Sequence, residues 1–72
     1  MRILGIDPGI GILGFGVIEG ESRSPKLVDA GVIRTTVKAP DAERLLAIFD
    51  GLQEIFEATK PQAVSVEKLF FA

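Results

Sequence analysis

The chain has 72 residues, of which eight are basic and ten acidic, giving a net charge of −2, and it contains no cysteine. A chain this short forms at most one small domain and buries only about 60% of the surface that its unfolded form exposes. No apolar stretch approaches the ~20 residues of a membrane helix, and the first apolar run reaches the charged Asp7 too soon for a secretory signal. The composition excludes disulfide stabilisation and predicts a cytoplasmic protein without a membrane segment.

The acidic balance disfavours a stand-alone nucleic-acid binder, because such proteins usually carry a basic surface. This objection weakens if the acidic residues bind metal ions, or if residues outside this sequence provide the basic groove. The sequence stops within an apolar run, Phe70, Phe71 and Ala72, with no helix cap or polar tail. We therefore expect residues 1–72 to be the N-terminal part of a single, truncated domain.

Three strands are predicted in the first half of the sequence. Residues 2–7 are apolar at positions that fall on both faces, as in a central strand. Pro8–Gly9 breaks this strand, and residues 13–19 then alternate between larger apolar side chains and glycine. Residues 26–36 are rich in β-branched side chains, which favour a strand. Gly31 within this segment indicates a bulge or a close approach of neighbouring groups.

An amphipathic helix is predicted over residues 41–59. Asp41 can cap its N-terminus, Glu43 suits the positive end of the helix dipole, and Pro61 ends the helix. Gly51 lies inside the helix at a cost of ~1 kcal/mol relative to alanine. Six apolar residues recur at helical spacing and form a stripe that we expect to cover one sheet face: Leu45, Ile48, Phe49, Leu52, Ile55 and Phe56.

The last predicted strand spans residues 63–67. The element order is then strand, strand, strand, helix, strand, which predicts an α/β fold with a mixed sheet. The short connections make the first three strands an antiparallel meander, and the helix returns the chain to a fourth strand parallel to the first. The simplest sheet order places this fourth strand beside the first, on the edge away from the second.

This topology brings two distant carboxylates together. Asp7 ends the first strand and Glu67 ends the fourth, and neighbouring strands lie ~4.8 Å apart. Both side chains should therefore project from the same end of the sheet, within reach of one ion. Hard oxygen ligands of this kind suit Mg²⁺, with Mn²⁺ as the alternative. Two such ions can clamp the attacking and leaving oxygens in phosphodiester hydrolysis.

Each acidic residue also has an ordinary structural interpretation. An aspartate before Pro–Gly is usually a turn former, and a glutamate at a strand end is usually a surface charge. Two features favour a functional Asp7: its strand is apolar on both faces, and the following Pro8–Gly9–Ile10–Gly11 lets backbone come close to a ligand. Glu67 gains weight only through its expected position beside Asp7.

Two segments resemble the RuvC family of Holliday-junction resolvases, which belongs to the ribonuclease H-like superfamily. Residues 3–9, Ile-Leu-Gly-Ile-Asp-Pro-Gly, and residues 13–18, Leu-Gly-Phe-Gly-Val-Ile, resemble the family's opening. Residues 64–71, Val-Ser-Val-Glu-Lys-Leu-Phe-Phe, resemble its second acidic motif. The distance between the motifs also matches, and the resemblance covers the whole chain.

The resemblance implies a ribonuclease H-like fold and a homodimeric endonuclease. Such an enzyme cuts four-way DNA junctions with divalent metal during recombination and repair, with a branch-migration complex as a further partner. It implies that Asp7 and Glu67 are metal ligands and that Phe70 stacks on an unpaired base, although Phe70 and Phe71 could equally be a buried pair. The family's other two acidic ligands lie in a later segment, so residues 1–72 are expected to be inactive alone.

Three alternatives stay open at this point. An actin-like ATPase or sugar kinase begins with a similar strand and phosphate loop, but Ile10, Ile12 and Leu13 stand where such loops carry polar side chains. A resolvase-like nuclease that processes ribosomal RNA precursors shares the fold and the aspartate motif, whereas residues 67–71 favour RuvC. A third possibility is a non-catalytic fragment that self-associates through an open sheet edge.

Overall fold

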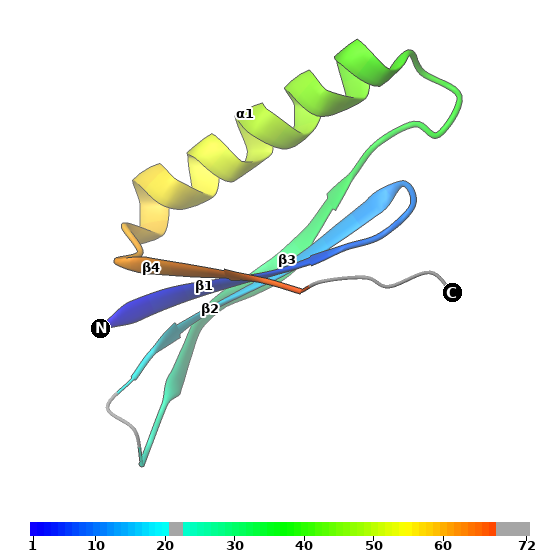
Figure 1. The fold of residues 1–72 in the computed structure, drawn as a ribbon. Helices are drawn as coiled ribbons and strands as arrows, with labels where there is room; N and C mark the ends of the chain where they lie inside the picture. The colour runs from blue at the N-terminus through cyan, green and yellow to red at the C-terminus, as the bar shows by residue number, and fades with distance from the viewer. Residues whose placement is uncertain (21–22, 68–72) are drawn as a thin grey trace.

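The computed structural model describes residues 1–20 and 23–67 and contains one four-stranded sheet and one helix (Figure 1). The elements are β1 (Arg2–Pro8), β2 (Ile12–Glu19), β3 (Lys26–Arg34), α1 (Asp41–Thr59) and β4 (Ala63–Val66). The sheet order is β3-β2-β1-β4, with β4 parallel to β1 and the other pairs antiparallel. The predicted mixed α/β sheet and the position of the fourth strand are both confirmed. Within the described ranges, no helix is long and apolar enough to cross a membrane.

The β1–β2 hairpin sets where the strands end. β1 continues one residue further than predicted, because Pro8 still pairs with Leu13. Gly11 then turns the chain with a φ of 73°, a conformation that glycine adopts without steric cost. β3 ends at Arg34 rather than at the predicted Thr36, because its partner β2 extends no further than the turn at Gly11.

Gly31 marks a close approach rather than a bulge. It pairs with Phe15 of β2, and a Cβ at Gly31 would lie 3.1 Å from two ring carbons of that phenylalanine. The register irregularity between β2 and β3 lies elsewhere, between Val17 and Ile18. The glycine therefore makes room for an aromatic ring that packs against the core.

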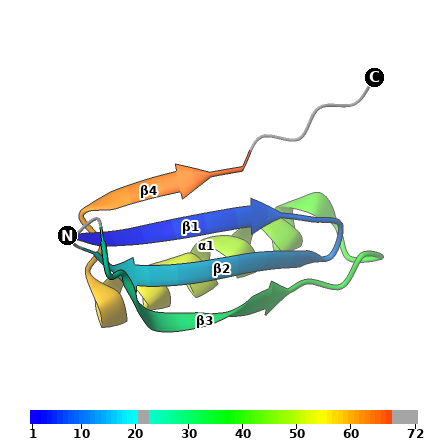
Figure 2. The same cartoon turned by 90° about the horizontal axis from the view of Figure 1, so that it is seen from below.

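The hydrophobic core lies between the sheet and α1, which covers one face of the sheet (Figure 2). Leu4 of β1 and Val17 of β2 are completely buried, and Ile55 of α1 is 9% exposed. Partly buried side chains extend this cluster: Ile6, Phe15, Ile33 and Leu52. Burying the central strands under the helix fixes which face of β1 remains open for Asp7 and its neighbours.

The start of α1 differs from the prediction. Pro40 occupies the N-cap position, Asp41 is the first helical residue, and no side chain caps the helix. The Pro40 carbonyl accepts a hydrogen bond from the Arg44 backbone amide at 3.1 Å. Pro40 is therefore the N-cap residue, and Asp41 lies in the first turn of the helix. There Asp41 and Glu43 complement the positive end of the helix dipole, as expected.

The apolar stripe of α1 is only partly buried, so the expectation that all of it covers the sheet is wrong. Ile55 and Leu52 join the core, whereas Leu45, Phe49 and Phe56 are 67%, 63% and 40% exposed. The helix packs against β3 and does not extend over β4 (Figure 2). The stripe is thus wider than the helix–sheet contact within the described residues.

Backbone and side-chain hydrogen bonds hold the connection from α1 to β4. Lys60 ends the helix in the left-handed conformation and donates its amide to the Phe56 carbonyl at 2.8 Å. The guanidinium of Arg2 donates to the backbone carbonyl of Thr59 at 2.8 Å. The backbone amide of Arg2 donates to the side-chain oxygen of Gln62 at 3.1 Å. The backbone amide of Gln62 in turn donates a hydrogen bond to the Arg2 carbonyl at 2.8 Å. These contacts set the register in which β4 enters the sheet.

Gly51→Ala tests the close approach of α1 to β3. In an exposed helix, this change would stabilise by ~1 kcal/mol. Here the new Cβ would lie 2.9 and 3.1 Å from Cδ1 and Cγ1 of Ile33, and overpacking costs about 1–3 kcal/mol. We expect the free energy of unfolding to fall by about 1 kcal/mol in denaturant titration. Ile33→Val should reduce that loss in a double-mutant cycle, and a stabilising Gly51→Ala would contradict the tight contact.

A polypeptide of residues 1–72 should be weakly stable or self-associated. β4 forms one edge of the sheet, and Val64 and Val66 on it are 49% and 59% exposed. An exposed apolar edge strand pairs readily with another chain. Sedimentation velocity should show species larger than a monomer, whereas sharp, cooperative calorimetric unfolding of a monomer would oppose this expectation.

Candidate metal-binding carboxylates

Asp7 and Glu67 come together at the carboxyl ends of two parallel strands. Asp7 is the sixth residue of β1, and Glu67 directly follows β4. The Glu67 amide donates to the Ile6 carbonyl at 2.9 Å, which extends the pairing of Ile6 with Val66 by one residue. That register sets Glu67 beside Asp7, so the predicted juxtaposition is confirmed, although Glu67 lies just outside the strand in which it was expected.

The charge state of Glu67 reflects this proximity. A hydrogen bond between the carboxyl groups of Glu67 and Asp7 raises the pKa of Glu67, and the negative charge of Asp7 and slight desolvation raise it further. Two carboxylates this close resist joint ionisation, because each negative charge disfavours the other. A bound cation would remove the repulsion and favour both ionised forms.

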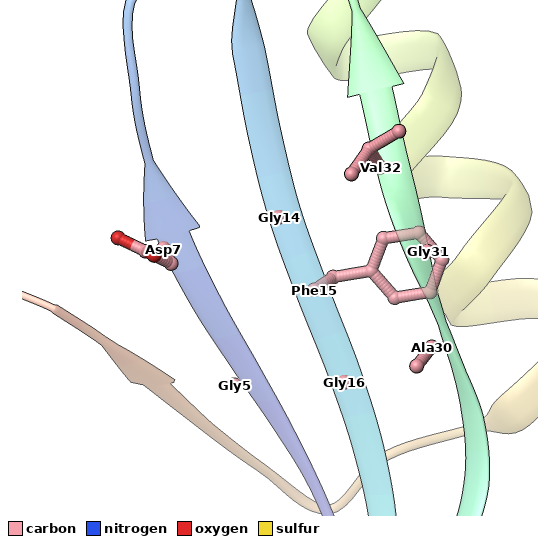
Figure 3. A pocket seen from close by; sticks show the side chains of 8 residues that line it. All are labelled: Gly5, Asp7, Gly14, Phe15, Gly16, Ala30, Gly31 and Val32. Carbon is pink, nitrogen blue, oxygen red and sulfur yellow. The ribbon is translucent and has the colours of Figure 1, made fainter.

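An open depression adjoins Asp7 on the sheet (Figure 3). It has a volume of about 510 Å³ and is lined by Gly5, Asp7, Gly14, Phe15, Gly16, Ala30, Gly31 and Val32. A Cβ at Gly14 would lie 3.9 Å from the Cβ of Asp7, and a Cβ at Gly16 would meet nothing within 4 Å. Because these glycines have no side chains, the surface beside the Asp7 carboxylate stays open, which leaves room for a bulky ligand to approach.

The donor set fits a hard divalent cation that retains water. Among residues 1–20 and 23–67, no cluster contains three or more histidine, cysteine, aspartate or glutamate side chains. Asp7 and Glu67 thus provide two carboxylates. Mg²⁺ is commonly held by one or two carboxylates together with waters and substrate phosphates. Asp7 and Glu67 alone cannot form a metal site that requires three or four protein ligands.

The row of glycines beside Asp7 was not predicted from the sequence, and one predicted site residue cannot be placed. The row of glycines beside Asp7 was visible as Gly14 and Gly16, which share one face of β2, but it was interpreted only as strand alternation. Arg34, at the same end of the sheet, was not among the residues predicted from the sequence. Phe70, predicted to stack on a base, lies outside the described residues.

The raised pKa of Glu67 gives a test of the carboxylate pair. Asp7→Asn should lower the pKa of Glu67 toward its ordinary range, because the negative neighbour is removed. Mg²⁺ added to the wild type should also lower it, and metal affinity should weaken as the pH falls through that pKa, because protons compete with the cation. Carbon-13 NMR titration of the Glu67 carboxyl measures both effects. Asp50→Asn on α1 is the control and should leave the titration unchanged, and an Asp7→Asn titration that matches wild type would refute the pairing.

Comparison with known proteins identifies the family. The sequence matches the family described as "Crossover junction endodeoxyribonuclease RuvC" over residues 3–72. RuvC proteins from Synechococcus sp. (strain WH7803) and Brevibacillus brevis are 46% and 49% identical over 71 residues, 99% of this chain. The chain spans only 46% and 43% of those two relatives.

Solved structures agree in fold. A structure described as T. thermophilus RuvC in complex with Holliday junction substrate superposes with a TM-score of 0.89 at 36% identity, over 100% of this chain and 46% of that one. A second Thermus thermophilus RuvC structure gives a TM-score of 0.85 at 38% identity, over 99% of this chain and 45% of that one. The sequence match and the ribonuclease H-like sheet together show that this chain belongs to the RuvC family of crossover junction endodeoxyribonucleases.

Proposed function

We propose that the protein containing this chain is a nuclease that resolves four-way DNA junctions by divalent-metal-dependent hydrolysis of phosphodiester bonds. The observation that carries the proposal is the pair of carboxylates, Asp7 and Glu67, at the ends of adjacent parallel strands in a RuvC-family chain. The structure of T. thermophilus RuvC with a Holliday junction substrate supports junction DNA as the ligand.

Asp7 and Glu67 would hold Mg²⁺, or Mn²⁺ in its place. When bound, such an ion supplies Lewis-acid stabilisation of phosphate oxygens and activates water as a nucleophile. The residues of this chain contribute the two negative charges, and the sheet fixes their separation. The raised pKa of Glu67 supports a site built to be neutralised by a cation.

The scope of the proposal follows from the length of the match. We infer that residues 1–72 form the N-terminal part of one nuclease domain, since they cover 46% of the T. thermophilus chain. The remaining acidic ligands, the dimer interface and most of the basic DNA surface would then lie in other parts of the protein. Phe70 would stack on an unpaired base near the crossover, and a branch-migration complex would be a further partner in the cytoplasm. Residues 1–72 alone would be inactive.

Asp7→Asn in the full-length protein separates catalysis from binding. The substitution keeps the side-chain shape and removes a metal-coordinating charge. Junction affinity should stay near the wild-type value, because phosphate contacts supply most of it. Cleavage at matched Mg²⁺ should fall by more than the roughly 10–100-fold loss that follows from mutating outer-shell partners of a metal site. Gel-shift titration and single-turnover cleavage of a labelled four-way junction measure the two quantities.

Asp50→Asn on α1 is the matched control, because it removes the same charge from an exposed helical position. It should bind and cleave as the wild type does. Equal cleavage by Asp7→Asn and wild type would exclude Asp7 as a metal ligand. Loss of binding together with cleavage in Asp7→Asn would instead indicate the turn-forming role of an aspartate before Pro–Gly.

A further inference from the structure

A second pocket lies between the end of β3 and the first turns of α1. It has a volume of about 210 Å³ and is lined by Arg34, Thr35, Thr36, Ala39, Glu43, Arg44 and Ala47. Two arginines and one glutamate are among its lining residues, so these residues carry a net positive charge in a chain whose overall charge is −2. This local excess of positive charge runs against the composition of the whole chain.

The donors in the pocket are available for an anion. Arg44 is half-buried and donates through Nε to the Thr35 hydroxyl at 3.4 Å, which leaves its terminal nitrogens for another acceptor. Among residues 1–20 and 23–67, the ion pairs are all to Glu19, so neither Arg34 nor Arg44 forms an ion pair with Glu43. The 19-residue helix α1 begins at this pocket without a side-chain cap, but Asp41 and Glu43 in its first turn offset the positive end of its dipole, so the arginines supply the positive charge.

The pocket opens at the same end of the sheet as the candidate metal site. β1, β3 and β4 run in the same direction, since β3 and β1 are both antiparallel to β2 and β4 is parallel to β1. Asp7 and Val32 pair with the same residue, Gly14, and Arg34 lies two residues further along β3. Two strand spacings and two residues of rise place Arg34 about 12 Å from Asp7, backbone to backbone.

We propose that Arg34, Thr35 and Arg44 bind a backbone phosphate of the nucleic acid a few nucleotides from the phosphate that would lie at the candidate metal site of Asp7 and Glu67. This inference rests on the proposed nuclease function and extends it to a second contact. Guanidinium groups form charge-assisted bonds with phosphate oxygens. A span of about 12 Å corresponds to three or four nucleotides at the ~3.4 Å axial rise of one DNA strand. The site would position the strand without reading its sequence.

Salt dependence of junction binding in the full-length protein tests the site. The dissociation constant of a four-way junction is measured from 50 to 200 mM KCl without Mg²⁺, so that no cleavage interferes. Each lost phosphate contact should reduce the slope of log affinity against log salt by ~0.9. We expect this reduction for Arg34→Gln and for Arg44→Gln, with a several-fold weaker affinity at the lowest salt concentration.

Two comparison variants make the result specific. Arg34→Lys keeps the positive charge and should retain most of the slope. Arg23→Gln removes a charge from the exposed turn at the opposite end of the sheet and should match the wild type. Arg34 is exposed, so the result for Arg34→Gln decides the question even if Arg44→Gln destabilises the fold. A slope for Arg34→Gln equal to that of wild type would overturn the proposed phosphate site.

Cleavage of the same junction in Mg²⁺, measured in parallel, keeps the two proposals apart. If the wild type binds the junction and Arg34→Gln lowers the slope, the phosphate site stands even where cleavage is absent, and only the nuclease proposal fails. If the wild type cleaves the junction while Arg34→Gln leaves the slope unchanged, the nuclease proposal stands and the phosphate site is refuted. An acidic protein as the true occupant of the pocket would also give the unchanged slope.

Discussion

The parallel pairing of β4 with β1 is the contact on which the candidate site depends. Four residue pairs, from Ile3 with Ala63 to Ile6 with Val66, bring together segments that are 60 residues apart in the chain. The bonds from Gln62 to Arg2 and from Glu67 to Ile6 close the two ends of this short ladder. Because the carboxyl groups of Asp7 and Glu67 repel each other when both are ionised, the backbone ladder must hold them side by side in that state.

This arrangement puts electrostatic strain where packing is weakest. β1 lies in the middle of the sheet, with Leu4 fully buried, whereas β4 is an edge strand with exposed valines. Asp7 is therefore fixed by the core, and Glu67 is fixed by an element whose outer side is open. The pKa of Glu67 is raised by its neighbour, and a cation would relieve that repulsion. Metal binding and docking of the edge strand should therefore support each other, since ligands that bind only the folded arrangement stabilise it.

The sequence predicted most of the fold because hydrophobic periodicity and turn residues agreed with each other. The apolar first strand, the helix that ends before Pro61 and the crossover rule led to the correct sheet order, and that order led to Asp7 and Glu67. The sequence could not show how far α1 reaches across the sheet, because Leu45 and Phe49 carry the same periodic signal as the buried Ile55. The pocket at Arg34 and Arg44 was also beyond reach, since it needs the end of β3 and the first turns of α1 in three dimensions.

The short ladder also determines where insertions and deletions can be tolerated. Residues 20–25 join β2 and β3 at the end of the sheet away from Asp7, so a length change there leaves the β1–β4 register untouched. A single residue inserted between Gln62 and Glu67 has the opposite effect, because a slip of one residue turns every following strand side chain to the other face. Glu67 would then face the α1 side of the sheet while Asp7 stayed on the other. Natural length variation in this family should therefore concentrate in the β2–β3 turn and avoid the four residues of β4.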